Sequence, residues 1–261
     1  MTLPEAIRTH IAGKTGHTDN IGMSGSCITV YDDCVLKIED LTPYTAENIE
    51  TMLWLQHRIP SPQVIHHEEQ DGKSYLLMSR IPGKMSCDPE YLEQPAVVLH
   101  TLADGLHLLW KTDSTGCPRD RTLPKLLQEA RWRVGNGLVD MDNVEPETFG
   151  PGGFESPMHL LNWLEANPVP SVPALAHGDY CLPNVFVLDG KFSGFVDVGD
   201  TGLGEKWRDI ALCYRSLRSN YNGSYGGKIY PDFDPNALFD ALNITPDWQQ
   251  IRYHLLLDEL F

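Results

Sequence analysis

The pattern of apolar and polar positions in the first eighty residues predicts strands around a single helix. Residues 27–39, CITVYDDCVLKIE, hold two β-rich runs on either side of an Asp-Asp pair, which is typical of a hairpin. Residues 45–57 carry apolar side chains at helical spacing, which predicts a helix. Residues 74–79, SYLLMS, follow an Asp-Gly turn and are predicted to form a buried strand. The N-terminal part is therefore expected to be a small β-rich unit with one helix.

Beyond residue 83 the pattern becomes mainly helical. Two short apolar runs, at 185–188 and 191–198, flank Asp189 and Gly190 and predict a small hairpin within this part. Helical spacing recurs in five stretches, at 93–110, 121–134, 157–166, 206–219 and 234–261. The chain is thus predicted to be an α+β protein, with a small β-rich N-terminal lobe and a larger, mainly helical C-terminal lobe. A cleft between two such lobes is a common place for a ligand.

Composition and charge narrow the class of function. The chain has 261 residues, of which 41% are hydrophobic and 21% charged, as in ordinary globular proteins. Its formal net charge of −16 argues against a nucleic-acid partner and is compatible with a cationic substrate. We expect no membrane span and no secretory signal, because no apolar run is long enough. The six cysteines are scattered, as is typical of reduced thiols, so we expect a cytoplasmic protein.

Three polar residues around the second predicted hairpin have the spacing of a phosphoryl-transfer site. Asp179 follows a His-Gly pair, Asn184 comes five residues later, and Asp197 stands two residues before a glycine. This order matches the catalytic-loop aspartate, the asparagine and the Asp-x-Gly aspartate of kinases. Asp179 is the candidate that orients an attacking hydroxyl and accepts its proton. Asn184 and Asp197 supply the hard oxygen ligands that Mg²⁺ prefers.

A kinase-type site also requires a lysine on a strand, an acidic partner on the next helix and a turn over the phosphates. Lys37 stands in the second β-rich run, and the helix that follows offers Glu47 and Glu50 as partners. Residues 22–25, GMSG, form a candidate turn whose amides can face phosphate, with Ser24 inside it. The residues that the spacing implies are therefore present.

At this point the chain resembles the aminoglycoside 3′-phosphotransferases, or kanamycin kinases, within the aminoglycoside- and choline-kinase-like small-molecule kinases. The resemblance covers nearly the whole chain and is loosest between about 85 and 170. It is carried by GMS at 22–24, MLWLQHRIPSPQV at 52–64, YLLMS at 75–79, HGDYCLPNVFVLDGKFSGFVDVG at 177–199, KWRDIALCYRSLR at 206–218 and the terminal TPDWQQIRYHLLLDELF. It implies a two-lobed protein-kinase-like fold. Residues 1–79 would form the nucleotide-binding lobe, 80–84 a hinge and 85–261 the catalytic and substrate-binding lobe.

The resemblance also implies residue roles on the nucleotide side. Asp179 is the catalytic aspartate, Asn184 and Asp197 are the Mg²⁺ ligands, and Lys37 contacts the phosphates of ATP, with GTP as an alternative donor. The other residues expected at the nucleotide are Ser24, Val35, Glu47, Ser79 and Ile81. The position of the family's glutamate, the partner of the lysine, holds Asn48 here. Glu47 is taken as the partner of Lys37 because a shift of one residue is easily absorbed in the loop before the helix. Either Glu47 or Glu50 can fill that role.

On the acceptor side, the resemblance implies an ATP-dependent transfer of phosphate to a hydroxyl, taken as the 3′ hydroxyl, of an aminoglycoside, which confers antibiotic resistance. The residues expected at the acceptor are Asp179, Asp200, Asp258, Glu259 and Phe261, the last through its terminal carboxylate. Asp209 is expected to brace the catalytic loop without taking part in the chemistry. The protein is expected to be a monomer or a weak homodimer.

Three other functions compete with this one. A protein kinase is disfavoured because too few residues separate Asp197 from Asp209 for an activation segment. A kinase for another small hydroxylated or cationic molecule, such as choline, homoserine or a different antibiotic, remains open, although the acidic C-terminus favours aminoglycosides. A silent nucleotide-binding module is disfavoured because it would need neither a base nor two metal ligands.

Overall fold

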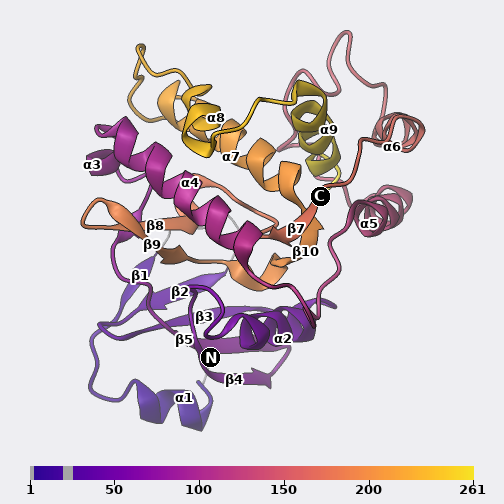
Figure 1. The fold of residues 1–261 in the computed structure, drawn as a ribbon. Helices are drawn as coiled ribbons and strands as arrows, with labels where there is room; N and C mark the ends of the chain where they lie inside the picture. The colour runs from indigo at the N-terminus through magenta and orange to yellow at the C-terminus, as the bar shows by residue number, and fades with distance from the viewer. Residues whose placement is uncertain (1–2, 20–25) are drawn as a thin grey trace.

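An antiparallel five-stranded sheet forms the N-terminal part of the molecule (Figure 1). The computed structural model describes residues 3–19 and 26–261. The strands follow the order β1-β2-β3-β5-β4. The elements of this part are α1 (Glu5–His10), β1 (His17–Asp19), β2 (Cys27–Val30), β3 (Cys34–Asp40), α2 (Thr45–Leu55), β4 (Val64–Gln70) and β5 (Lys73–Ser79).

The two faces of this sheet pack against different neighbours, because successive side chains of a strand point to opposite faces. Tyr75 and Leu77 of β5 share a buried cluster with Ile7 of α1. Leu76, between them, belongs to the large central cluster together with Leu55 of α2. Helix α1 therefore covers one face of the sheet, and α2 connects the other face to the rest of the protein.

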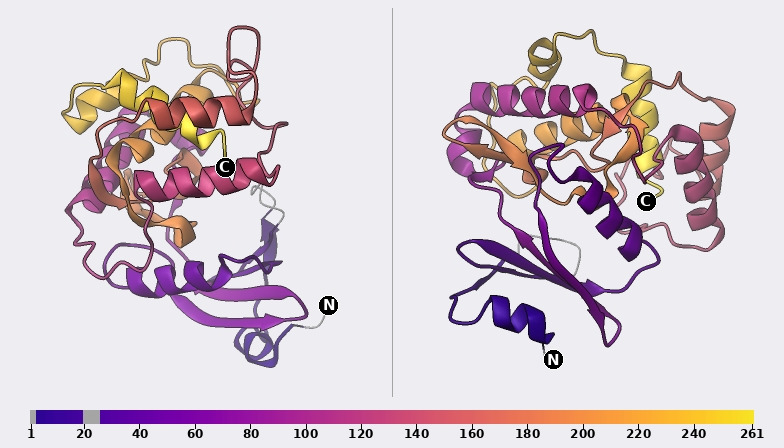
Figure 2. Two further views of the ribbon diagram at one scale, coloured as in Figure 1. Left: turned by 90° about the vertical axis from the view of Figure 1, so that its right-hand side faces the viewer. Right: turned by 60° about the horizontal axis from the view of Figure 1, so that its bottom comes forward.

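The remainder of the chain is mainly helical and lies against the α2 side of the sheet (Figures 1 and 2). Two small antiparallel sheets, β6-β8-β9 and β10-β7, lie within it. Its elements are β6 (Lys84–Met85), α3 (Pro89–Leu92), α4 (Pro95–Lys111), α5 (Leu123–Gly135), α6 (Pro157–Ala166), β7 (Pro173–Ala176), β8 (Val185–Leu188), β9 (Lys191–Phe195), β10 (Gly202–Glu205), α7 (Lys206–Tyr221), α8 (Ala237–Leu242) and α9 (Trp248–Asp258). Two 3₁₀ turns, η1 (Leu182–Asn184) and η2 (Val198–Asp200), flank the hairpin of β8 and β9.

One continuous core joins the two parts. Leu55 of α2, Leu102 and Leu106 of α4, Phe195 of β9 and Ile210 of α7 are all fully buried members of it. Burial of one such leucine stabilises the fold by about 2 kcal/mol. Because this core reaches from α2 to the loops around β8 and β9, it fixes those loops relative to the N-terminal sheet.

Most of the predicted elements are present, and the differences have local causes. The helical stretch 234–261 is divided into two helices: Asn243 adopts a left-handed conformation after α8, and the Asp247 side chain caps α9. The pattern of apolar positions does not predict α1, β1, β6, α3, β7 or β10. β7 and β10 pair with each other across the catalytic loop, so their pairing is not visible as a local pattern. Within the described ranges, the helices are too short or too polar to cross a membrane.

Candidate active site

The loop that carries Asp179 is held by a buried carboxylate. β7 ends at Ala176, and the next two backbone amides both donate to Asp209 in the first turn of α7: His177 N to Oδ2 at 2.7 Å, and Gly178 N to Oδ1 at 3.0 Å. Gly178 has a φ of +88°, and a Cβ there would lie 2.7 Å from an oxygen of Asp200. Only glycine fits this position without strain. Asp209 thus has the bracing geometry that the family resemblance implies.

Asp179 and Asn184 contact each other directly. The Asn184 side-chain amide donates to both the backbone oxygen and Oδ2 of Asp179, each at 2.9 Å. The Asp179 amide donates to Nδ1 of His177 at 3.3 Å, so the other ring nitrogen carries the proton and donates to the Val196 carbonyl at 3.0 Å. The spacing in the sequence therefore corresponds to a single connected loop.

The Asp179 carboxylate is accessible to solvent but is surrounded by protein groups. This desolvation raises its pKa, and the negative charges of Asp258 and Asp197 raise it further. The interaction with His177 and the hydrogen bond from Asn184 act in the opposite direction. A raised pKa makes the carboxylate a stronger base, as a group that accepts a proton from a hydroxyl requires.

Asp197 lies next to Lys37, as the kinase-type interpretation predicts. It follows β9 with a left-handed backbone (φ +55°), and its Oδ1 is 3.6 Å from the Lys37 Nζ. Lys37 also pairs with Glu39, two residues along β3, at 2.9 Å. Burial alone would lower the pKa of Lys37, but the two carboxylates raise it above its ordinary value. The lysine is therefore a stable cation at the base of the site.

The predicted pairing of Lys37 with Glu47 is wrong in this structure. Glu47 lies on α2, and its carboxylate is 3.6 Å from the guanidinium of Arg119. Glu50 is exposed on the same helix. The lysine is instead neutralised from its own strand, because residues two apart on a strand project from the same face.

Val35, Ser79 and Ile81, also predicted to contact a nucleotide, lie on β3, at the end of β5 and just after it. Val35 is two residues before Lys37 on β3 and therefore shares its face. Ser79 ends β5, and its amide donates to the Gln63 carbonyl while its hydroxyl accepts from the Gln63 amide, each at 2.9 Å. Ile81 is buried. Ser24 lies outside the described residues.

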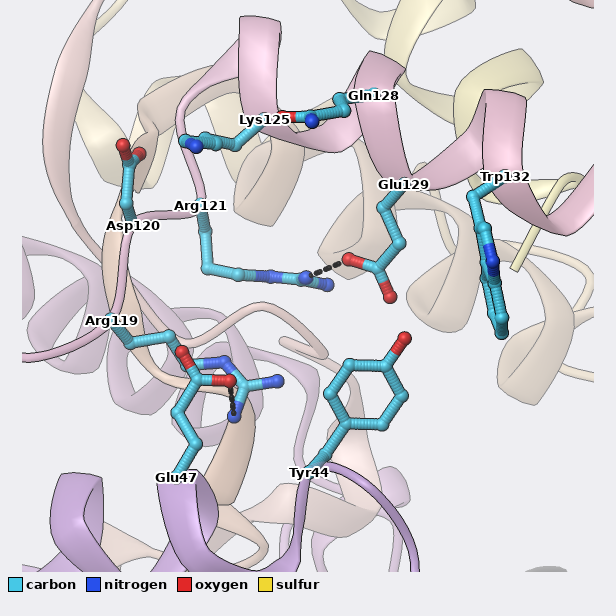
Figure 3. A pocket seen from close by; sticks show the side chains of 9 residues that line it. All are labelled: Tyr44, Glu47, Arg119, Asp120, Arg121, Lys125, Gln128, Glu129 and Trp132. Carbon is cyan, nitrogen blue, oxygen red and sulfur yellow. Dashed lines mark hydrogen bonds and ion pairs between the residues drawn. The ribbon is translucent and has the colours of Figure 1, made fainter.

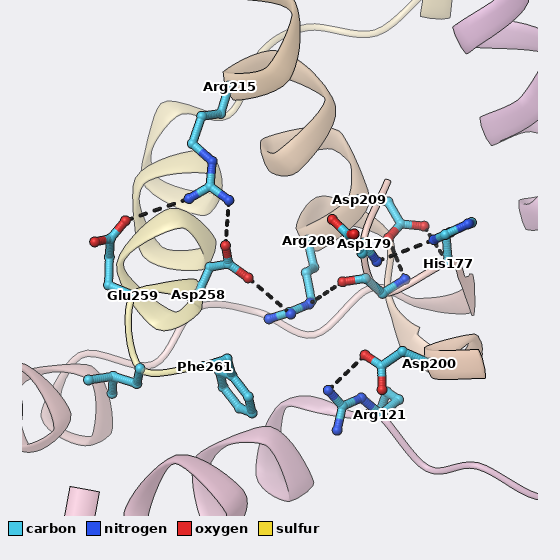
Figure 4. Close-up of polar contacts among 12 residues, drawn as sticks. Arg121, His177, Asp179, Asp200, Arg208, Asp209, Arg215, Asp258, Glu259 and Phe261 are labelled. Atoms are coloured by element: carbon cyan, nitrogen blue, oxygen red, sulfur yellow. Dashed lines mark hydrogen bonds and ion pairs between the residues drawn. The ribbon is translucent and has the colours of Figure 1, made fainter. Parts of the chain in front are cut away.

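Apart from Asp179, the side-chain carboxylates predicted to bind an acceptor pair with arginines (Figure 4). Asp200 lies 2.7 Å from Arg119 and 2.9 Å from Arg121. Asp258, at the end of α9, lies 3.1 Å from Arg208 and 2.5 Å from Arg215. Each of these negative charges is therefore balanced by arginine in this structure, and their contact with an acceptor stays a prediction.

The end of the chain is anchored in the same way. Glu259 is buried; it lies 3.6 Å from Arg215 and accepts a hydrogen bond from the Glu145 amide at 2.8 Å. A backbone oxygen of Phe261 accepts from Arg133. The Phe261 ring lies 5.4 Å from the guanidinium carbon of Arg208 (Figure 4). The chain end is thus beside the catalytic loop, but with its acidic groups paired.

Sequence reasoning missed these arginines. Arg119 and Arg121 come from the irregular segment before α5, and Arg208 and Arg215 stand seven residues apart on α7. The only available signal was the dense PRDR run at 118–121 and the spacing on α7. Neither signal indicates which carboxylates these arginines pair with, because those carboxylates are distant in sequence.

Two cavities are lined in part by residues of these ion pairs. The first, of about 350 Å³, opens between α2 and α5 (Figure 3). Its lining mixes charge and aromatic surface: Tyr44, Glu47, Arg119, Asp120, Arg121, Lys125, Gln128, Glu129 and Trp132. The second, of about 680 Å³, lies on the other side of α9 and includes Arg215 and Glu259 in its wall. Both cavities therefore share residues with the ion pairs that surround the candidate acceptor side.

Asn184 and Asp197 fit a hard divalent cation. The Asn184 amide nitrogen donates to Asp179, which leaves its side-chain oxygen available as a metal ligand, and the Asp197 side chain is 59% exposed. The Val196 amide donates to the Asn184 carbonyl at 3.0 Å, which holds the two segments together. Carboxylate and amide oxygens are the donors that Mg²⁺ takes.

Comparison with known proteins agrees with this geometry. A model of the phosphotransferase enzyme family matches residues 30–252. The chain belongs to this family. It is 37% identical over 214 residues to an aminoglycoside 3′-phosphotransferase from Enterococcus faecalis, which covers 81% of this chain and 77% of the relative. The predicted resemblance is thereby confirmed, and the protein is an enzyme, a kinase.

Solved structures of phosphotransferases share the fold of this family member. A type VIII aminoglycoside 3′-phosphotransferase superposes with a TM-score of 0.79 at 24% identity, and the match covers 98% of this chain and 97% of that chain. An aminoglycoside phosphotransferase from Streptomyces rimosus in complex with ADP and streptomycin gives a TM-score of 0.75 at 20% identity, covering 97% and 95%. The predicted two-lobed, kinase-like α+β fold is confirmed.

Proposed function

We propose that the protein transfers the γ-phosphoryl group of ATP to the 3′ hydroxyl of an aminoglycoside, and so confers resistance. The observation that carries this proposal is the contact of Asp179 with Asn184, on a loop beside the Lys37–Asp197 pair. The names of the curated relatives support the acceptor. The ADP in the Streptomyces rimosus complex supports the nucleotide, with GTP as a further candidate donor.

In this proposal, Asp179 orients the acceptor hydroxyl and accepts its proton as the hydroxyl attacks. Its pKa is raised by desolvation, which favours proton acceptance, and the amide of Asn184 fixes the orientation of its Oδ2. Transfer of a phosphoryl group needs little covalent help from a protein, so positioning of the two reactants supplies most of the rate enhancement. The brace from Asp209 serves that positioning.

Positive charge on the nucleotide side stabilises the phosphates. Lys37 would contact them, and Asn184 and Asp197 would hold Mg²⁺. When bound, Mg²⁺ neutralises the charge of the phosphate oxygens. Val35, Ser79 and Ile81 would contact the adenine ring. Ser24 would lie over the phosphates.

Replacing Lys37 with methionine is expected to raise the KM for ATP roughly tenfold, because a charge-assisted contact to phosphate is lost while side-chain length is kept. Initial rates at varied ATP concentration measure this. Lys191→Met, on the exposed tip of the β8–β9 hairpin, is the matched control and should leave the KM for ATP unchanged. An unchanged KM in Lys37→Met would contradict the assignment of this lysine.

The paired acids on the acceptor side favour one alternative acceptor class. Asp200, Asp258 and Glu259 are each balanced by arginine, so a polycationic acceptor would have to compete with those ion pairs. A kinase for a less highly charged molecule, such as choline, homoserine or another antibiotic, would not meet this competition. The acceptor panel below separates the two.

The decisive experiment is ADP release in a coupled assay across a panel of aminoglycosides with and without a 3′ hydroxyl, with choline and homoserine as controls. We expect turnover with aminoglycosides that carry the 3′ hydroxyl and none with those that lack it. Turnover only with choline or homoserine would favour the alternative. Equal turnover with and without the 3′ hydroxyl would refute the proposed regiochemistry.

We also propose how the chain is organised around this reaction. Residues 1–79 would bind the nucleotide, 80–84 act as a hinge and 85–261 hold the catalytic loop and the acceptor. The six cysteines are free thiols, which supports a reducing cytoplasm as the place of action. We propose a monomer or a weak homodimer, in which each site is built from the residues of one chain.

A further inference from the structure

Helix α2 touches the turn that carries the candidate metal ligand. A Cβ on Gly199 would lie 3.2 Å from the side chain of Asn48, so the helix and the turn η2 are in close contact there. Lys37 does not provide the link, since its ion pairs in the described part of the chain are to Glu39 and Asp197. A polar link between α2 and the Asp197-x-Gly turn, beyond this packing, comes from a different residue.

Arg119 provides this connection. Its Nη1 donates to the Asn48 side-chain oxygen at 2.5 Å and to the Gly199 carbonyl at 3.0 Å. Its Nη2 lies 2.7 Å from Asp200, and Glu47 of α2 is 3.6 Å from Nη1. One planar guanidinium therefore contacts two residues of the helix and two of the turn, a geometry that lysine cannot reproduce.

The arginine is itself rigidly placed. Its side chain is 6% exposed. Its carbonyl accepts from the Leu203 amide at 2.9 Å, and the Arg121 amide donates to the Leu203 carbonyl at 2.7 Å, so the backbone runs along β10. Gly202 permits this approach, because a Cβ there would lie 2.7 Å from the Arg119 carbonyl. The guanidinium thus projects from a fixed backbone.

The turn requires such a support. Asp197 has a left-handed backbone, which costs a residue with a side chain of the order of 1 kcal/mol and persists only where the surroundings impose it. Its carboxylate is the group that must point at the metal. Movement of the turn by about 1 Å is enough to cost on the order of 10²-fold in rate.

We propose that Arg119 is a positioning residue that couples helix α2 to the Asp197-x-Gly turn and thereby fixes Asp197 for Mg²⁺–nucleotide binding. The inference rests on the proposed use of a nucleotide with Mg²⁺. It goes beyond the proposed function because it gives Arg119 a role of its own. This arginine lies outside both the N-terminal sheet and the catalytic loop, and it links helix α2 to the candidate metal ligand.

The test is the affinity for ADP in Mg²⁺ and in EDTA, measured by isothermal titration calorimetry. Arg119→Met keeps most of the side-chain volume and removes the planar guanidinium group. We expect the enhancement of ADP binding by Mg²⁺ to fall roughly tenfold and kcat to fall between 10- and 100-fold. Arg131→Met, which removes an exposed ion pair with Glu165, is the matched control and should leave both quantities unchanged.

A second variant separates coupling from folding. Asn48→Ala removes the shorter of the two contacts of Arg119 with α2 and leaves the one to Glu47. It should reduce the enhancement by Mg²⁺ in the wild-type background but not in the Arg119→Met background. A folded Arg119→Met protein with wild-type enhancement would overturn the proposal. If Arg119→Met does not fold, wild-type enhancement in Asn48→Ala would overturn it instead. Failure of aminoglycoside turnover in the wild type would refute the proposed substrate but leave the calorimetric result interpretable.

Discussion

Replacing Asp179 with alanine is expected to lower kcat by about 10³-fold, because loss of a positioned base typically costs between 10² and 10⁴ in rate. The carboxylate is solvent-accessible, so its removal creates no buried cavity and stability should change little. ADP binding should persist, since the phosphates would contact Lys37 and the metal ligands. Rates measured with saturating substrates, together with calorimetric titration of ADP, check both halves of the prediction.

Two further variants sharpen this result. Asp179→Asn keeps the shape and still faces the amide of Asn184, but it cannot accept a proton, so it should be nearly as inactive as the alanine variant. Asp240→Ala, at an exposed position on α8, is the matched control and should be fully active. Turnover within tenfold of wild type in either Asp179 variant would rule out Asp179 as the base.

The connected loop around Asp179 could be predicted because its parts are close in sequence. The spacing of Asp179 and Asn184 corresponds to a short loop that closes through η1, and the two side chains meet as that spacing implies. The hairpins were predictable for the same reason. Lys37 was predictable because its strand and the Asp-x-Gly motif have fixed places in kinase-type sites, and the structure brings it to Asp197.

The charge balance of the site was not predictable, because it depends on pairs that are distant along the chain. Arg121 and Asp200 are 79 residues apart, and Arg208 and Asp258 are 50 apart. A sequence shows that acids are present but not that arginines from other segments neutralise them. The same limitation explains why the sequence predicts Glu47 as the partner of Lys37. In the structure Lys37 pairs with Glu39 of its own strand, and Glu47 pairs with Arg119 from a distant loop.

The second large effect is expected at Asp209, which the resemblance places beside the chemistry and not in it. Asp209→Ala should lower the free energy of unfolding by about 3 kcal/mol, because two buried backbone amides lose their acceptor. It should also lower kcat, since the His177-Gly178 turn positions Asp179. Chemical denaturation measures the first effect and initial rates the second, with Asp240→Ala again as the control.

The pH dependence of this stability effect gives a test that simple loss of packing would not meet. Burial raises the pKa of Asp209 from 3.8 to about 6 in the folded protein. The folded state therefore binds the proton more tightly than the unfolded state, so the contribution of Asp209 to stability is largest below about 3.8 and is lost as the pH rises through about 6. The difference in unfolding free energy between the wild type and Asp209→Ala should accordingly be larger at pH 5 than at pH 8. A difference that is constant or smaller at pH 5 would mean that the carboxylate is stabilised as an anion by its two amide donors more strongly than burial disfavours it.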